Sequence, residues 1–295
     1  MEGPSVAIAF IVREKFGWAL AALRRIFQLV DTPFTVYFVD CGYPVVVRRD
    51  IDAFLAGRTN VVHIAAERFL YPNESLNLII PRLQEDYLCI IQNDVLIEPG
   101  YMSAMLATFD EHGCDIVSPM TFELQGSTRK PHRDNFTDTR IRERGGKLFV
   151  QVRQSPPAVP PPPVRQIQHF ELHTLMMTAS AANVVWPLPV INTREHIDLA
   201  VHAFRRGMRV YANENACASY VLPPIRDYDQ AFFEFRWNLN VARGSHVCVA
   251  RRWNIDRLPS SLVFVEQHST YAAPGVVLRD RPEACEPDIY AAESA

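Results

Sequence analysis

Apolar segments of strand length alternate with segments of helical spacing between Ser5 and Pro119, and this alternation constrains the fold most strongly. Strands are expected at Ser5–Val12, Phe34–Val39, Asn60–Ile64, Tyr87–Ile91 and Cys114–Pro119. Helical spacing of apolar residues predicts the segments between them, at Gly17–Val30, Arg48–Leu55, Glu74–Leu83 and Pro99–His112. Strands that are apolar throughout are buried on both faces, so the pattern predicts an α/β fold with a mainly parallel central sheet and flanking helices.

The second half of the chain continues the mixture of strands and helices. Strands are expected at His169–Thr178, Met208–Tyr211 and Ala216–Val221, and helices at Arg194–Arg206 and within Tyr228–Trp253. The Pro-rich stretch at 155–164 is expected to be an exposed, extended linker or loop, because its prolines are stiff and lack an amide donor. Residues 256–295 are expected to form a C-terminal extension that ends in an acidic, flexible tail.

Charge and cysteine usage exclude several classes of protein. The chain carries 30 Lys and Arg against 33 Asp and Glu, a net charge of −3, whereas a general nucleic-acid binder is clearly basic. No apolar run reaches the roughly 18 residues that span a bilayer. The 6 cysteines are scattered without a C-x-x-C pair, which predicts reduced thiols in a cytoplasmic protein and gives no zinc pattern. The oligomeric state is not indicated.

Residues 129–153 form a locally basic stretch with little periodicity. Such a stretch is usually a solvated surface. The alternative is a flap that faces a phosphorylated ligand.

A short motif at the end of a predicted central strand carries the chemistry. The run Tyr87–Ile91 is followed by Gln92, Asn93 and Asp94, and then by a Pro-Gly helix start. An acid at the carboxyl end of a buried strand can hold a divalent cation against a diphosphate, although Asp94 could instead stabilise a turn. Glycine-rich dinucleotide and P-loop motifs are not found, which argues against those folds.

This pattern resembles that of the GT-A fold nucleotide-diphospho-sugar transferases, specifically family 2 glycosyltransferases. Further segments fall in the order of that family: Phe34–Pro44, Asn73–Asn77 and the helix start Thr193–Leu199. A bacterial subgroup is similar also at Arg13-Glu14, Glu171–His173 and Tyr220–Pro224 leading to Arg236-Trp237. The resemblance covers roughly residues 5–255 and implies a GT-A fold with a C-terminal helical extension. Because it runs on both sides of the Pro-rich stretch, it also implies one domain over residues 1–255, with 155–164 as a loop inside it.

The resemblance also implies a set of site residues. Those expected to bind the nucleotide-sugar are Arg13, Glu14, Asp40, Asn73, Asn77, Gln92, Asn93 and Asp94. Asp94 is the expected ligand of a divalent cation, manganese or magnesium. Gln92 stands where the family has the first acid of its metal motif, and Tyr220 where many relatives have a metal-binding His, so the cation requirement stays open.

The helix start at Thr193–Leu199 is expected to carry the catalytic base. His196 aligns with the usual basic Asp, and an imidazole is a competent base near neutral pH. Glu195 is the other candidate base. Its alternative role is structural, as the partner of Asn192 in a capping box at the start of the helix. Asp198 is expected to orient the acceptor, or to pair with His202 one turn later.

The resemblance implies transfer of a sugar from a nucleotide-diphospho-sugar, with a UDP-sugar favoured, to an acceptor hydroxyl with inversion. The acceptor, a glycan, natural product or peptide, is undefined. One alternative is a degenerate, non-catalytic relative that binds a nucleotide or a partner. Another is a nucleotidyltransferase, which would need a Gly-rich loop where Arg13–Gly17 stands.

Overall fold

The structure is a computed structural model that describes residues 3–132, 138–153, 161–222 and 224–270. The acidic tail that we predict, and most of the Pro-rich loop at 155–164, lie outside the described residues.

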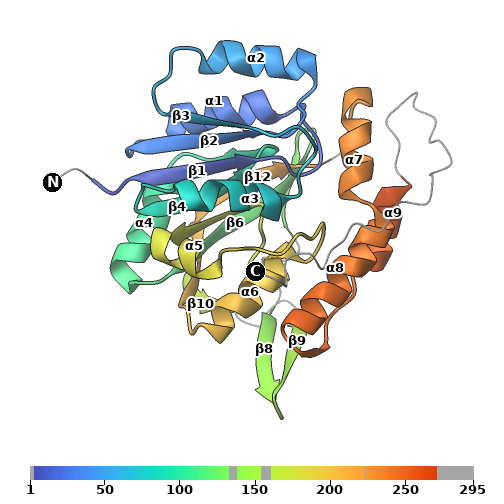
Figure 1. Cartoon of the computed structure of the whole chain (residues 1–295). Helices are drawn as coiled ribbons and strands as arrows, with labels where there is room; N and C mark the ends of the chain where they lie inside the picture. The colour runs from blue at the N-terminus through green and yellow to red at the C-terminus, as the bar shows by residue number, and fades with distance from the viewer. Residues whose placement is uncertain (1–2, 133–137, 154–160, 223, 271–295) are drawn as a thin grey trace.

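The first half of the chain forms the parallel part of the central sheet, as the alternation predicts. Strands β4, β1, β2 and β3 lie side by side in that order, and each pair of neighbours is parallel. The elements are β1 (Val6–Ile11), α1 (Ala19–Leu29), β2 (Phe34–Asp40), α2 (Val45–Leu55), β3 (Val61–Ala65), α3 (Pro72–Ile79) with the 3-10 turn η1 (Ile80–Arg82), and β4 (Tyr87–Gln92). Helices α1 and α2 cover one face of these strands (Figure 1).

The second half extends the sheet beyond β4 in the order β11, β6, β12 and β10. Strand β11 is antiparallel to both of its neighbours, whereas β6 and β12 are parallel. These strands are β6 (Ile116–Gln125), β10 (Val164–Ile167), β11 (Thr174–Thr178) and β12 (Val210–Val221), with the short β5 (Val95–Ile97) and β7 (Thr128–Pro131) at the side. The sheet is therefore mixed. The two strands that we predict within 208–221 are one strand, which continues through an irregularity between Asn213 and Cys217.

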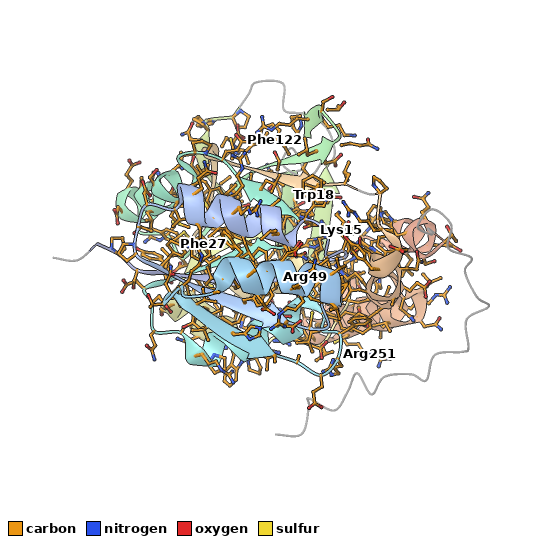
Figure 2. All side chains as sticks on the ribbon, turned by 90° about the horizontal axis from the view of Figure 1, so that it is seen from above. Lys15, Trp18, Phe27, Arg49, Phe122 and Arg251 are labelled. Carbon is orange, nitrogen blue, oxygen red and sulfur yellow. The ribbon has the colours of Figure 1, made fainter. Side chains whose placement is uncertain are left out.

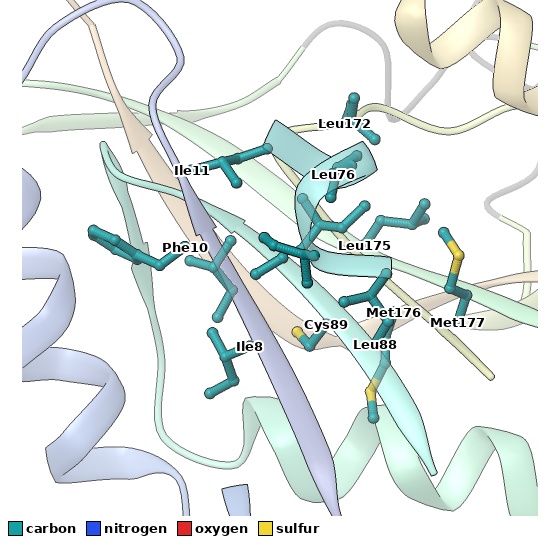
Figure 3. Packing of buried hydrophobic residues seen from close by; sticks show 14 of the residues in the cluster. Ile8, Phe10, Ile11, Leu76, Leu88, Cys89, Leu172, Leu175, Met176 and Met177 are labelled. Atoms are coloured by element: carbon teal, nitrogen blue, oxygen red, sulfur yellow. The ribbon is translucent and has the colours of Figure 1, made fainter. Parts of the chain in front are cut away.

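The core lies along the central strands. Residues of β1, β4 and β11, among them Ile8, Leu88 and Met176, are fully buried and pack together in one cluster (Figure 3). Burial on both faces explains why these strands are continuous apolar runs in the sequence.

The basic stretch 129–153 forms strand structure that the sequence reading missed. Strands β8 (Asp138–Arg144) and β9 (Lys147–Arg153) pair as a hairpin, and β13 (Ile255–Arg257) joins β9 to give a three-stranded sheet. Ile141, Leu148 and Val150 are buried on one side of the hairpin. Basic side chains of this stretch bind acids outside it: Arg129 pairs with Glu98, Lys130 Nζ lies 3.2 Å from Glu123, and Lys147 Nζ lies 2.8 Å from Asp256.

The remaining helices surround the sheet and build its C-terminal side. They are α4 (Tyr101–His112), α5 (Ala179–Val185), α6 (Glu195–Arg205), the 3-10 turn η3 (Asp227–Asp229), α7 (Gln230–Arg236), α8 (Leu239–Arg252) and α9 (Leu262–Ser269). Helices α7, α8 and α9 stand together beside the sheet (Figure 1). None of the helices in the described part of the chain has the length and apolarity that crossing a bilayer requires.

Candidate active site

A cavity of about 760 Å³ opens where β1, β4 and β12 end and β11 begins. Ligands in α/β sheets bind outside the carboxyl ends of the strands, and this cavity has that position. Five of the 9 histidines of the chain are among its lining residues, which come from strand ends, from the start of α6 and from α9: Arg13, Gln92, Glu123, His132, His169, Glu171, Leu172, His173, Thr193, Arg194, Glu195, His196, Ile197, Tyr220, Leu222, Arg236, Trp237, Pro259, Ser260, Ser261, Val263, Phe264, Val265, Gln267 and His268.

The start of α6 presents two candidate bases to the cavity. Arg194 precedes the helix with a φ of 72°, a left-handed conformation that side chains other than glycine rarely adopt. Glu195 and His196 both line the cavity. The capping box that we weigh for Asn192 and Glu195 is wrong, because Asn192 lies outside the helix and its amide donates to the carbonyls of Arg236 and Asn238.

Glu195 is held by a guanidinium. Its Oε1 lies 2.9 Å from Arg236 Nη2, and both side chains are buried. Burial lowers the pKa of Arg236, and the charge of Glu195 opposes that effect. A carboxylate that balances a buried cation is committed to that partner.

His196 is surrounded by groups that could hold a proton or a metal ion. Its Nε2 lies 3.7 Å from Glu171 Oε1, and its ring meets the His169 ring edge-on at 5.4 Å. Burial holds the pKa of His196 well below its ordinary value, and the charges of His169 and Arg194 lower it further. His169, Glu171 and His196 each offer a ligand atom, all within 4.8 Å of one another, so among the described residues they form a candidate metal-binding group.

Arg13 brings positive charge to the other side of the cavity. Its guanidinium lies 4.7 Å from the centre of the Tyr220 ring, and its Nη1 donates to Nε2 of His173 at 2.9 Å. Burial and the nearby Arg13 charge hold the pKa of His173 well below normal, so this imidazole is neutral. Tyr220 stacks on His173, with the ring centres 4.1 Å apart.

Beneath Arg13 lies a buried charge cluster, which we define as Glu14, Lys15 and Asp94. Lys15 Nζ is 3.1 Å from Glu14 Oε1 and 3.1 Å from Asp94 Oδ2, and it also donates to the carbonyl of Val221. Burial opposes ionisation of Glu14, but the charges of Lys15 and Arg13 outweigh it and lower its pKa to about 2. Burial raises the pKa of Asp94, with the charge of Lys15 acting against it.

Asn93 fastens the charge cluster to the sheet. Its Oδ1 accepts from the backbone N–H of Arg13 at 3.2 Å, and its Nδ2 donates to the carbonyl of Lys15 at 2.7 Å. Asn93, Glu14 and Asp94 are buried and are not among the cavity-lining residues. Of the residues that we predict to bind the nucleotide-sugar, the structure thus brings Arg13 and Gln92 to the cavity wall.

Three other predicted nucleotide ligands make contacts away from the cavity. Asp40 pairs with Arg48, and its Oδ1 accepts from the backbone N–H of Gly42 and Tyr43, a turn role. Asn73 Nδ2 donates to the carbonyl of Pro189. Asn77 exchanges hydrogen bonds with the backbone of Leu188.

Asp198 also points away from the cavity. Its carboxylate accepts a hydrogen bond from Trp253 Nε1 at 2.6 Å and lies 3.7 Å from Arg252 Nε. It is fully buried, and burial raises its pKa. Glu195 and His196 line the cavity, whereas Asp198 binds the end of α8. Nor are the described Lys and Arg side chains of 129–153 among the lining residues.

Sequence reasoning missed the contribution of the C-terminal extension. Helix α9 brings Val263, Phe264 and His268 to the cavity, and the His268 ring packs at a tilt against those of Phe264 and Trp237. His132 and His169 were not singled out either. The apolar run Leu262–Val265 after Pro259 was the available signal for α9.

No protein-family model matches the chain, and no curated protein matches it. Solved structures do match. Staphylococcus aureus TarS (residues 1–349), in complex with UDP-GlcNAc, superimposes with a TM-score of 0.56 at 13% identity over 90% of this chain and 70% of TarS. The mannosyltransferase PcManGT from Pyrobaculum calidifontis, with GDP-Man and Mn²⁺, gives 0.56 at 10% identity over 91% and 70%. GalNAc-T7, with UDP, GalNAc and Mn²⁺, gives 0.56 at 10% identity over 75% of this chain and 43% of its own.

The chain has the GT-A fold. This confirms the fold that the resemblance implies. At these identities the likeness establishes architecture alone, and the family 2 assignment stays a prediction.

Two of these GT-A structures contain Mn²⁺, so we ask whether Asp94 fits a divalent cation. Its carboxylate already has the Lys15 ammonium at 3.1 Å and has no exposed surface. Gln92 supplies an amide where a second carboxylate would help. The surroundings of Asp94 therefore do not fit a divalent cation in this arrangement.

Proposed function

We propose that the protein transfers a sugar from a nucleotide-diphospho-sugar to an acceptor hydroxyl with inversion, with a UDP-sugar favoured as donor. The observation that carries the proposal is the cavity at the strand ends of a GT-A sheet, with His196 and three arginines on its wall. The architecture is shared with structures that contain UDP-GlcNAc or GDP-Man.

His196 is the base in this proposal, since Glu195 is committed to Arg236. Its lowered pKa keeps the imidazole neutral near pH 7, which is the form that accepts a proton. The acceptor oxygen attacks the anomeric carbon as its proton passes to His196 and the bond to the diphosphate breaks. Glu171, 3.7 Å from Nε2, stabilises the imidazolium that forms.

The leaving diphosphate needs positive charge. Arg13 and Arg236 line the cavity, and Nε and Nη1 of Arg236 have no hydrogen-bond partner among the described residues. Donors that are held ready in a buried site stabilise developing charge strongly. Asp40, Asn73, Asn77 and Asn93 act in this proposal by holding the backbone around the site, and Asp198 by anchoring α6.

The test is a panel of UDP- and GDP-sugars incubated with the full chain, with release of the nucleoside diphosphate as the readout. Wild type and His196→Ala are compared. Donor consumption that depends on His196 supports the proposal. Nucleotide binding without consumption of any donor supports instead the non-catalytic alternative, which the pairing of Asp94 with Lys15 favours.

A further inference from the structure

We propose that the cavity binds its nucleotide without a divalent cation, because the Lys15 ammonium permanently holds the Asp94 carboxylate. The inference rests on the proposed function and concerns how that site balances the charge of a diphosphate.

Lys15 is held by two hydrogen bonds and an ion pair with Asp94. An ammonium has three N–H donors. Here it donates to Glu14 Oε1 and to the Val221 carbonyl, and it forms an ion pair with Asp94 Oδ2 at 3.1 Å. Neither Asp94 oxygen has a hydrogen-bond partner among the described residues. The Lys15 side chain is 1% exposed. Its contacts connect the segments that follow β1 and β4 to the end of β12. The side chain is labelled in Figure 2. If the ammonium moved away from Asp94, it would leave a buried charge without its partner. The ion pair therefore keeps Lys15 in place.

Few oxygen ligands for a cation lie around Asp94. A hard cation needs several oxygen ligands. Gln92 is an uncharged amide, and the side chain of Asn93 already binds the backbone of Arg13 and Lys15. Burial raises the pKa of Tyr220 far above normal, so its phenol stays protonated. A cation here would find one carboxylate, paired with a lysine, and the uncharged amide oxygen of Gln92.

The other candidate metal-binding group consists of His169, Glu171 and His196. Two imidazoles and a carboxylate suit zinc or cobalt better than magnesium. The charges of Arg194, Arg13 and Arg236 act on His196, and positive charge nearby opposes the binding of a cation.

Two arginines at the cavity can take the place of a divalent cation in binding a diphosphate. Both arginines line the cavity, and they come from different elements: Arg13 follows β1, and Arg236 lies at the end of α7. Guanidinium groups match phosphate oxygens through paired donors. The structure thus presents guanidinium donors at the cavity. Glu195 balances the charge of Arg236, but Nε and Nη1 of Arg236 have no hydrogen-bond partner among the described residues.

The test is isothermal titration calorimetry of the full chain with UDP and with GDP, in EDTA and then with Mn²⁺, Mg²⁺ or Zn²⁺. We expect a Kd in EDTA within about twofold of the Kd with Mn²⁺. Binding that is about tenfold or more tighter with any of these ions overturns the inference. If the dependence is on Zn²⁺ and disappears in His169→Ala, the cation belongs to the histidine group instead. If neither nucleotide binds under any condition, the proposed function fails and the inference with it.

A lysine variant sharpens the test. Lys15→Met keeps the length of the side chain and frees Asp94. We expect nucleotide binding in EDTA to weaken by about tenfold or more, and Mn²⁺ to restore part of it. The matched control is Lys147→Met, which removes an exposed lysine paired with Asp256 and should bind as wild type does. A folded Lys15→Met protein that binds as wild type in EDTA contradicts the inference. The wild-type comparison decides the question even if this variant does not fold.

Discussion

The carboxylate of Glu195 lies 2.9 Å from the guanidinium of Arg236, and both side chains are buried at the wall of the cavity. This pair joins the start of α6 to the end of α7. It leaves His196, the next residue, as the candidate base that is not bound to a guanidinium.

The first prediction tests this pair as a structural unit. Glu195→Ala leaves the Arg236 charge buried without its partner, so we expect the free energy of unfolding to fall by about 3–5 kcal/mol. The double variant Glu195→Ala/Arg236→Met removes both charges and should recover most of that loss. Urea denaturation measures both. Equal destabilisation of the single and double variants would show that the unpaired Arg236 charge is not the cause of the loss.

The second prediction concerns His196. His196→Ala removes the proposed base, and we expect turnover of the donor to fall by about 10²–10⁴-fold. The nucleotide Kd should stay close to that of wild type, because the base acts on the acceptor. Glu171→Gln should give a smaller loss, since it removes the charge near the imidazolium and keeps the shape. Full turnover in His196→Ala would return the role of base to Glu195.

The alternation of apolar strands and helices predicted the first half of the fold, because strands buried on both faces leave a continuous apolar signal. The hairpin of β8 and β9 was missed for the opposite reason. Its buried residues Ile141, Leu148 and Val150 alternate with polar or partly exposed ones on short strands. Basic residues on the outer side dominated the reading of that stretch.

The site was predicted as a set of segments more successfully than as a set of side chains. The strand end at Gln92 and the helix start at Glu195 do meet at one cavity. The direction of each side chain depends on tertiary partners that one sequence does not reveal. Lys15 is an example, since its partner Asp94 lies far along the chain and nothing local marks the pair.

The third prediction separates Asp198 from the chemistry. Trp253→Phe removes the indole N–H that binds the buried Asp198 carboxylate, and we expect a loss of about 1–3 kcal/mol in unfolding free energy. The nucleotide Kd and turnover at a temperature where the variant is folded should match wild type. A variant of unchanged stability but with weakened use of the acceptor would restore the role in orienting the acceptor that the resemblance implies for Asp198.

The last prediction concerns the pH dependence of stability, through His202. This side chain is largely buried, and its Nε2 accepts from Arg206 Nε at 3.5 Å. Burial, followed by the charges of Arg252 and Arg206, lowers its pKa to about 4, against about 6.5 in an unfolded chain. Between those values the unfolded chain takes up a proton that the folded protein does not, so His202 costs stability as the pH falls from 6.5 to 4. His202→Gln keeps an acceptor and does not titrate, so on going from pH 8 to pH 4 the wild type should lose up to about 3 kcal/mol more than the variant. Urea denaturation of both proteins across this range gives the difference, with pH 8 as the reference. Parallel stability curves would show that His202 does not titrate abnormally.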